Sequence, residues 1–187
     1  MKTYLKTISL GIFILLLSCN ESDDTNISNP TPTSDSFLPM HIGNYWKYDE
    51  DNYTEITDTL RIEGDLYYKF YSLIGGDAVT FQYLRIDTNQ NLIQGYPDNP
   101  DFKHIHAKFN TSLEDTFWTL NNKSVNDFKA TLIEKDDNLR TYAFQRFYKN
   151  PEEEKLFVSY IRGLGWNYNF YTTSYKQIKI DGEIYNF

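Results

Sequence analysis

Short stretches in which apolar and polar residues alternate recur along this chain of 187 residues. In residues 80–86, Phe81 and Tyr83 fall on one face of an extended strand, whereas Leu84 and Ile86 fall on the other. A β-bulge, or a strand buried on both faces, would explain this change of face. Because no long segment has apolar residues at the 3.6-residue spacing of a helix, we expect β-strands to predominate.

Two hairpins are indicated by turn residues between such segments. Residues 129–133 and 139–147 are predicted to be strands, and the polar residues 135–138 form the turn between them. Residues 178–185 contain Asp181-Gly182 between two short apolar segments, and this pair favours a type I′ turn.

These signals predict roughly ten to twelve short strands in all. Residues 67–71 carry aromatic side chains on both faces, which indicates a strand covered on both sides. Only residues 151–154, a proline followed by three glutamates, resemble a helical turn. Since no strand–helix–strand units occur, we predict an all-β domain. It would be a strongly curved antiparallel sheet or a barrel-like meander with at most one short helical turn.

The beginning of the chain has the layout of a secretory signal. Lys2 and Lys6 give a positive start, and residues 8–17 form an apolar segment within the roughly 7–15 residues expected of a signal peptide. A membrane-spanning helix needs roughly 20 apolar residues, so we expect this segment to be removed. Ser18 supplies the small residue before the cut, which makes residues 1–18 the predicted signal peptide.

Residues 16–19, Leu-Leu-Ser-Cys, resemble the lipobox of bacterial lipoproteins. The resemblance implies that the Cys19 thiol carries diacylglycerol and that the new amino group of Cys19 is acylated as well. Two or more acyl chains anchor a protein stably, because each buried methylene contributes roughly 0.8 kcal/mol. The membrane is therefore the expected partner. The alternative is an ordinary cleaved signal in which Cys19 is incidental.

Residues 20–36 are rich in Asn, Ser, Thr, Pro and Asp and contain no aromatic residue, so we expect a flexible tether after Cys19. As a coil this tether would span roughly 20–25 Å. Glu21, Asp23 and Asp24 resemble the acidic tag that sends some Bacteroidota lipoproteins to the outer face of the outer membrane. The alternative is that these acids belong to an ordinary solvated spacer. We therefore expect the protein at the bacterial outer membrane, and the choice between its periplasmic and its surface-exposed face stays open.

Charge and composition exclude several kinds of partner and chemistry. The formal net charge is −8, and loss of Lys2 and Lys6 would make it more negative. Such a chain repels phosphate backbones, so we expect no nucleic-acid partner. Cys19 is the only cysteine. The folded domain, residues 37–187, therefore has no disulfide or thiolate and must rely on an apolar core. We expect no cofactor.

Five short segments spread along this domain resemble motifs that occur in other chains. Their motifs resemble the "PLxVGNxWxY", "GxxYYK", "YxxDxxGN", "GDTW" and "YxxGVGLV" of a family of uncharacterised Bacteroidota lipoproteins. The segments are residues 37–48, 64–69, 83–92, 113–117 and 160–166. Glu114 departs from the family's glycine, which leaves the geometry of that turn open. The resemblance implies an antiparallel β domain on a lipoprotein and no established reaction.

Candidate metal ligands are His104 and His106, which would point to one face of a strand. Asp98 or Asp101 could add a third ligand. Zinc and iron sites need three or four ligands, and no further ligand stands at a recognisable spacing, so two surface histidines are favoured over a metal.

Candidate ligand contacts are Trp46, Trp118 and Trp166, each within or beside one of these motifs. Exposed aromatic rings bind sugars, and the abundance of tyrosine makes glycan binding a reasonable alternative. Large aromatic residues also dominate ordinary β cores, so we favour core positions for all three.

Acidic clusters occur at residues 49–51, 98–101, 136–137 and 152–154, all in turn-like or polar segments where solvated charge is expected. A glycosidase needs two carboxylates across a cleft, which a sequence does not reveal. The chain has no G-x-S-x-G, Walker or H-E-x-x-H motif, so we expect no enzyme. Asp58-Thr59-Leu60 resembles the Bacteroidota O-glycosylation signal, with Thr59 as acceptor; an ordinary strand residue is the alternative.

We therefore expect a lipid-anchored lipoprotein whose β domain is a non-enzymatic binding or scaffolding module. One alternative is a carrier that encloses a lipid or another apolar ligand in a concave sheet. Another is a carbohydrate-binding module or an accessory protein of glycan degradation.

Overall fold

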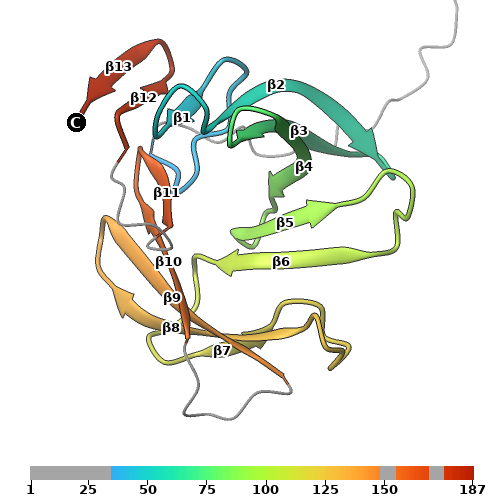
Figure 1. Cartoon of the computed structure of the whole chain (residues 1–187). Coiled ribbons are helices and arrows are strands. Elements are labelled where there is room, and N and C mark those ends of the chain that lie inside the picture. Colours follow the sequence, from blue (N-terminus) through green and yellow to red (C-terminus); the bar gives the residue numbers. More distant parts are fainter. Residues whose placement is uncertain (1–34, 148–154, 169–174) are drawn as a thin grey trace, which may run out of the picture.

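The computed structural model describes residues 35–147, 155–168 and 175–187. The predicted signal peptide, Cys19, the tether up to residue 34 and the helical turn at 151–154 lie outside these residues. The described part contains thirteen strands in two antiparallel sheets and no helix, so the all-β prediction is confirmed. The two sheets face each other and do not close into a barrel (Figure 1).

The first sheet has eight strands in the order β13-β12-β1-β2-β3-β4-β5-β6. The strands span Tyr45–Lys47 (β1), Tyr53–Ile62 (β2), Asp65–Ile74 (β3), Ala78–Ile86 (β4), Asn91–Gly95 (β5), Lys103–Lys108 (β6), Gln177–Ile180 (β12) and Glu183–Asn186 (β13). Most neighbours are consecutive in sequence, but β12 pairs with β1, so the last part of the chain returns to complete the first sheet.

The second sheet has five strands in the order β11-β10-β9-β8-β7. These strands span Thr116–Trp118 (β7), Phe128–Lys135 (β8), Leu139–Arg146 (β9), Leu156–Ile161 (β10) and Gly165–Tyr168 (β11). A single backbone hydrogen bond joins β6 to the residue after β7: the Ile105 N–H donates to the Thr119 carbonyl at 2.8 Å. This bond places the edges of the two sheets side by side.

Irregular pairing bends the long strands. The register shifts between Ile56 and Asp58 in β2, between Leu92 and Ile93 in β5, and between Leu132 and Glu134 in β8. An unpaired residue increases the local twist and bends its strand. The strong curvature predicted for one sheet is thus present, but it is divided between two sheets that face each other.

Both predicted hairpins are present. Strands β8 and β9 flank residues 136–138, and β12 and β13 flank Asp181-Gly182. Asp181 and Gly182 have φ values of 51° and 91°, the positive pair that a type I′ turn requires. Glu114 also has a positive φ, 68°, so the turn keeps a left-handed conformation at the position where the resembled family has glycine.

The core fills the space between the sheets with large aromatic side chains. Trp46 of β1, Phe70 of β3 and Trp166 of β11 lie within 5.3–6.1 Å of one another, measured between ring centroids. The indole N–H of Trp46 donates to the Leu164 carbonyl, which joins the first sheet to the turn before β11. Strand β3 has fully buried residues on both faces, Tyr67 on one and Phe70 on the other. The predicted cover on both sides is therefore present only in part, because Tyr71, on the same face as Tyr67, is half-buried.

Residues at the start of the described chain close one end of this core. Phe37, Leu38 and Met40 are buried. The guanidinium groups of Arg140 and Arg162 lie 4.5 and 4.4 Å from the centroid of the Phe37 ring. The Gly163 N–H donates to the Ser36 carbonyl at 2.8 Å, so the chain is held in place from the first described residues onward.

Candidate binding surface

Two of the three candidate tryptophans are core residues. Trp46 has no exposed surface and Trp166 has 5%. Each packs against Phe70 and against the other. This burial agrees with the core positions favoured from the sequence, and it makes the alternative role of these two rings as ligand contacts wrong, because alternation places them on the inner faces of the two sheets.

Trp118 lies on the opposite face of its strand from buried Phe117 and is half-buried. Its ring meets the exposed Phe147 ring edge-on, with centroids 5.5 Å apart. Of the three tryptophans, it alone keeps a partly accessible ring.

His104 and His106 point to the same side of β6, as predicted, and their rings stack with centroids 4.4 Å apart. His104 of β6 pairs with Gln94 of β5, and Gln94 pairs with Leu84 of β4, which is a core residue. Paired residues point to the same face of a sheet, so the two histidines face the space between the sheets. His106 Nε2 is 2.9 Å from Gln94 Oε1, which also accepts a hydrogen bond from Gln82 at 3.3 Å. The expectation that both histidines lie at the surface is therefore wrong. They are half-buried and form a hydrogen-bonded network with the side-chain amides of Gln94 and Gln82.

The environment keeps both imidazoles neutral. Burial, and secondarily the neighbouring His104, lower the pKa of His106 to about 3, although its side chain keeps some exposed surface. Burial lowers the pKa of His104 as well, and this outweighs the opposing charge of Asp127. In the described part of the chain no three His, Cys, Asp or Glu residues converge, and Asp98 and Asp101 do not join the pair. Two neutral imidazoles alone do not complete a zinc or iron site.

Asp127 is the most enclosed carboxylate of the described residues, with no exposed surface. Its oxygens accept hydrogen bonds from the backbone N–H groups of Leu120, Asn122 and Lys123 at 2.8–3.0 Å, and from the Thr119 hydroxyl. Burial alone would raise the pKa of Asp127, but these donors hold it below its ordinary value. The carboxylate is fully occupied in ordering the loop after β7.

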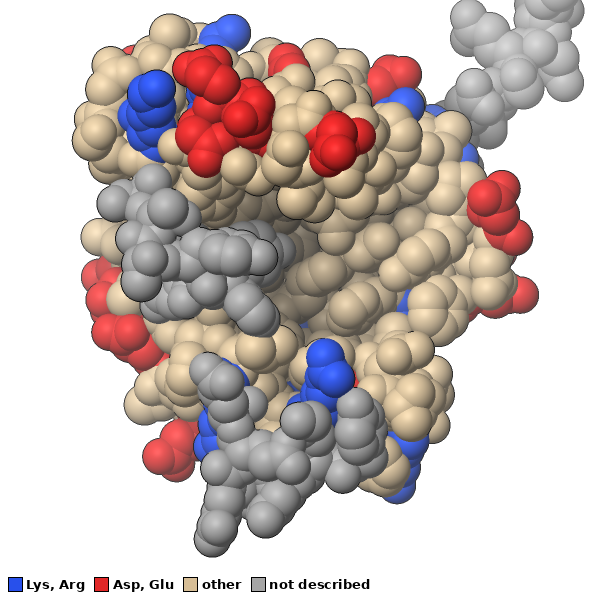
Figure 2. Space-filling view, viewed as in Figure 1, with Lys and Arg blue, Asp and Glu red and all other residues tan. Residues whose placement is uncertain are grey.

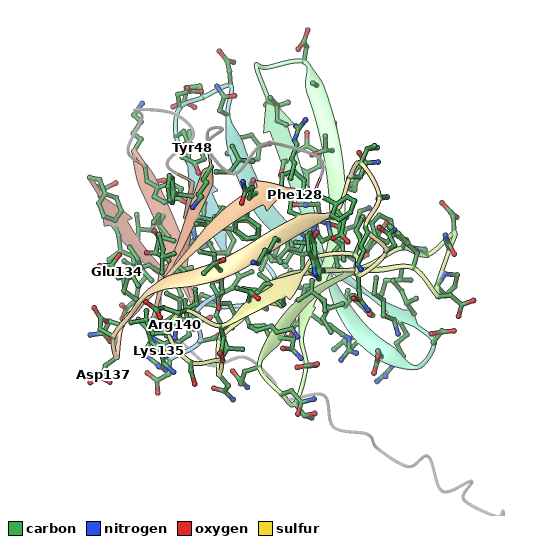
Figure 3. All side chains as sticks on the ribbon, turned by 90° about the horizontal axis from the view of Figure 1, so that it is seen from below. Tyr48, Phe128, Glu134, Lys135, Asp137 and Arg140 are labelled. Atoms are coloured by element: carbon green, nitrogen blue, oxygen red, sulfur yellow. The ribbon has the colours of Figure 1, made fainter. Side chains whose placement is uncertain are left out.

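The acidic clusters of the described chain lie in turns. Residues 49–51 form the β1–β2 turn, where Asp49 Oδ1 accepts the Asp51 N–H at 2.8 Å. Residues 136–137 lie at the tip of the β8–β9 hairpin, near Lys135 and Arg140 (Figure 3). Residues 152–154 lie outside the described chain. Thr59 is a half-buried residue of β2, and its glycosylation stays a prediction.

The outer face of the first sheet carries an aromatic surface that the sequence did not single out. Across β1 to β4, the register aligns Tyr45, Glu55, Tyr71 and Phe81 in one row. Tyr53 lies two residues before Glu55 in β2, so its side chain is on the same face as this row, and Tyr53 pairs with Leu73 of β3. The row lies on the side of the sheet away from Trp46 and Phe70, because side chains alternate along each strand.

We define the aromatic patch as Tyr53, Tyr71 and Phe81. The Tyr53 and Tyr71 centroids are 5.9 Å apart, and those of Tyr71 and Phe81 are 5.8 Å apart. Phe81 is 50% exposed, and the two tyrosines are half-buried. Partial desolvation, together with the neighbouring Tyr71, raises the pKa of Tyr53, so its hydroxyl remains protonated at neutral pH.

Two tight connections keep the three rings together. Strands β2 and β3 form a long hairpin, and β3 and β4 are joined at Gly75-Gly76, whose φ values of 63° and 80° suit a residue without a Cβ atom. Two apolar residues, Leu73 and Val79, extend the patch. They pair with each other across β3 and β4, and Val79 is 46% exposed. Apolar side chains that are contiguous at the surface are a common feature of binding sites, whereas scattered ones are ordinary.

Charged side chains border the patch. The Lys69 ammonium lies 4.4 Å from the Phe81 centroid, and Glu55 lies between Tyr45 and Tyr71 in the paired row. The Tyr45 hydroxyl donates to Gln177 of β12, which links this face to the last part of the chain. The surface thus combines fixed rings with hydroxyl, ammonium and carboxylate groups.

A second feature is a hollow between the sheets, visible on the face shown in Figure 2. Its surroundings are mostly uncharged, whereas Asp and Glu side chains gather on the first-sheet side of the same view. Deeper in the molecule, the space between the sheets is filled by core residues such as Trp46 and Phe109.

No protein-family model, no curated protein and no solved structure matches this chain. Among the described residues, no helix has the length and apolar character to cross a membrane.

Proposed function

We propose that this protein is a lipid-anchored, non-enzymatic binding protein of a bacterial outer membrane, and that the aromatic patch is its contact surface. The sequence supports the anchor through the lipobox-like residues 16–19 and the polar segment that follows them. The observation that carries the binding role is the contact between Tyr71 and Phe81. These rings meet on an outer sheet face, where Phe81 contributes nothing to the core and is half exposed.

A single exposed ring is ordinary on a protein surface, so it is the contact between several rings on one sheet face that supports the proposal. A ring that is half exposed loses much of the stabilisation that burial would give it, about 25 cal/mol for each Å² left in water. Aromatic residues are enriched where a protein meets a partner, because they bring a large rigid contact area with few rotatable bonds.

Two alternatives receive less support. An apolar-ligand carrier needs an empty apolar interior, whereas large side chains such as Trp46, Phe70 and Tyr142 fill the centre of this domain. An enzyme needs a perturbed acid, base or nucleophile in a cleft. Asp127, the enclosed carboxylate, is saturated by hydrogen bonds from its own loop.

The anchor is tested on the protein made in its own cell. Mass analysis of the mature N-terminus should show a chain that begins at Cys19 with acyl groups, and a Cys19→Ala variant should leave the membrane fraction. Globomycin, which blocks the lipoprotein signal peptidase, should retain residues 1–18. A mature chain with an unmodified Cys19 would refute the anchor.

The contact surface is tested by placing a photo-activatable phenylalanine analogue at position 81. Cross-linking in intact cells should give a defined adduct from this position. The matched control is position 157, where the exposed Phe157 of β10 lies on the second sheet. Equal yields from both positions would show that the patch has no special role.

A further inference from the structure

The first sheet ends in an open edge at β13. The strand order of this sheet finishes with β13, and one edge of the strand pairs with β12. In the described part of the chain no strand pairs with its other edge. All residues of β13 are exposed, and the strand stands at the rim of the molecule, away from the strands β7 to β10 (Figure 1).

The opposite edge of the same sheet, at β6, is engaged. The Ile105 N–H donates to the Thr119 carbonyl at 2.8 Å. The Lys108 N–H donates to the Tyr142 hydroxyl at 3.2 Å, and that hydroxyl donates to the Lys108 carbonyl at 2.7 Å. The two edges of this sheet are therefore treated differently by the fold.

Strand β13 also lacks the devices that keep other strands away from an edge. Such devices are Lys or Pro residues on the strand and bulges that bend it. The sequence of β13 is Glu-Ile-Tyr-Asn, and its pairing with β12 runs without a register shift. The edge is therefore open to a further strand.

The hydrogen bonds of the β12–β13 hairpin show which backbone groups face this open edge. The Phe187 N–H donates to the Lys176 carbonyl at 3.2 Å, so the backbone of Phe187 points toward β12. Alternate residues of an antiparallel strand direct their N–H and C=O groups to the same neighbour. Tyr185 therefore bonds to β12 as well, whereas Ile184 and Asn186 direct their backbone groups to the open edge.

We propose that β13 pairs antiparallel with β13 of a second copy of this chain, about a two-fold axis at Tyr185. In this register Ile184 lies opposite Asn186 of the other copy, and each such pair exchanges both of its N–H···O bonds. The Tyr185 residues of the two copies lie opposite each other in the non-hydrogen-bonded pair at the centre. All the free backbone groups of Ile184 and Asn186 are then satisfied.

The strand is complementary to itself in this register. Glu183 is its only charged residue, and it lies opposite Phe187 of the other copy, so like charges do not meet. No other register of two identical strands pairs all of residues 183–187. These features favour a second copy over a strand of unrelated sequence.

Exposed rings add apolar contact to the pairing. Tyr185 pairs with buried Ile178, so its side chain points to the core face of the sheet, and Phe187 follows two residues later on the same face. The second sheet leaves these two rings 38% and 66% exposed. Pairing places them beside the same rings of the other copy and removes apolar surface from water.

The interface is short, so its occupancy depends on how the copies are confined. Lipid-anchored copies share one membrane plane, which raises their effective concentration. This step rests on the proposed anchor at Cys19, whereas the pairing of β13 itself does not.

The test is cysteine cross-linking of the full-length protein in its own membrane, read on non-reducing gels. Tyr185→Cys should give a disulfide-linked dimer, because the Cα atoms of a non-hydrogen-bonded pair are roughly 4.5 Å apart, within the range that a disulfide spans. Ile184→Cys is the matched control. Its two cysteines stand out of register and should give about tenfold less dimer. Adding Asn186→Cys to Ile184→Cys should restore the cross-link, because these two positions face each other.

A second variant tests the hydrogen bonds of the edge. Asn186→Pro, combined with Tyr185→Cys, removes an N–H from the open edge and keeps the bonds of β13 to β12. The yield of dimer should fall about tenfold because the proline cannot donate. Near-ultraviolet circular dichroism should stay unchanged, since β13 lies outside the core cluster.

The outcomes separate this inference from the proposed anchor. No dimer from position 185, equal dimer from positions 184 and 185, or a yield that Asn186→Pro leaves unchanged would overturn the pairing. A cross-link from position 185 to a different protein would overturn it as well, because the edge then takes another protein's strand. Disulfide dimers of the unaltered protein would show that Cys19 carries a free thiol. The anchor then fails, and an excess of dimer at position 185 over this background still supports the pairing.

Discussion

Gly165 lies directly against the indole of Trp46, although 118 residues separate Trp46 from the Leu164 carbonyl that its N–H binds. A Cβ atom at position 165 would stand 2.9 Å from Trp46 Nε1 and 3.0 Å from Trp46 Cζ2. The two sheets therefore meet at a point where only a hydrogen atom fits.

Gly165→Ala should destabilise the domain by about 2–4 kcal/mol, because the new methyl group overlaps Trp46 and the residue has a φ of 98°. Chemical denaturation measures this loss. The matched control is Gly182→Ala, which has a φ of 91° but no atom within 4 Å of its Cβ. It should cost only about 1 kcal/mol. Equal losses would show that the contact with Trp46 has no energetic weight.

Arg162→Ala should loosen the start of the folded domain. The Arg162 side chain donates to the Asp35 carbonyl at 2.9 Å and to the Asp137 carbonyl at 2.7 Å, and it lies over Phe37. We expect a loss of about 1–2 kcal/mol and faster proteinase K cleavage near Ser36, measured by mass spectrometry. Arg61→Ala, which removes an exposed side chain bound to the Gly64 carbonyl, is the control. A cleavage rate equal to that of the control would contradict the prediction.

The His106 imidazole should make stability fall in mild acid. Its pKa is about 3 in the folded protein and 6.5 as an ordinary histidine, so between these values the unfolded chain binds more protons. The free energy of unfolding is therefore fully retained above pH 6.5. It falls as the pH drops toward 3, by up to about 1.4 kcal/mol per pH unit.

Urea denaturation at several values between pH 6.5 and 4.5 measures this slope. His106→Gln keeps a hydrogen-bonding group near Gln94 and should flatten the slope relative to the unaltered protein. His41→Gln removes an exposed imidazole and is the control. An unchanged slope in His106→Gln would show that another group causes the acid sensitivity.

Asp127→Asn should release the loop after β7. The carboxylate accepts the backbone N–H groups of Leu120, Asn122 and Lys123, whereas an amide offers only one accepting oxygen. We expect a loss of about 2–3 kcal/mol and faster hydrogen exchange at these three amides. The control is Asp136→Asn, which removes the same charge from an exposed turn. In this variant the amides of Leu120, Asn122 and Lys123 should keep their protection from hydrogen exchange.

Alternation and turn residues predicted much of this fold. The β8–β9 and β12–β13 hairpins follow from local signals, since Asp181-Gly182 adopts the positive φ values that its residue types favour. The division into two sheets did not follow. It depends on where bulges bend strands and on the return of β12 to β1, which pairs Tyr45 with Lys179 and Trp46 with Ile178 from opposite ends of the described chain.

The candidate surface was harder to predict than the fold. Large aromatic residues at Trp46 and at Phe81 look equally suited to a core in the sequence, yet one has no exposed surface and the other is 50% exposed. Phe81 and Tyr83 did stand apart from Leu84 and Ile86, which was the one local signal. The register then added Tyr71 and Tyr53 from neighbouring strands.

The sequence by itself determined the strand content and the hairpin turns, because each depends on residues close together in the chain. The lipid anchor at Cys19 rests on the sequence alone and stays a prediction. The tertiary structure alone decided which face of each strand is core. Alternation separates the two faces of a strand but assigns neither to the interior until another layer covers it. The packing of the second sheet on Trp46 and Phe70 made that choice, and it left Tyr71 and Phe81 on the outside.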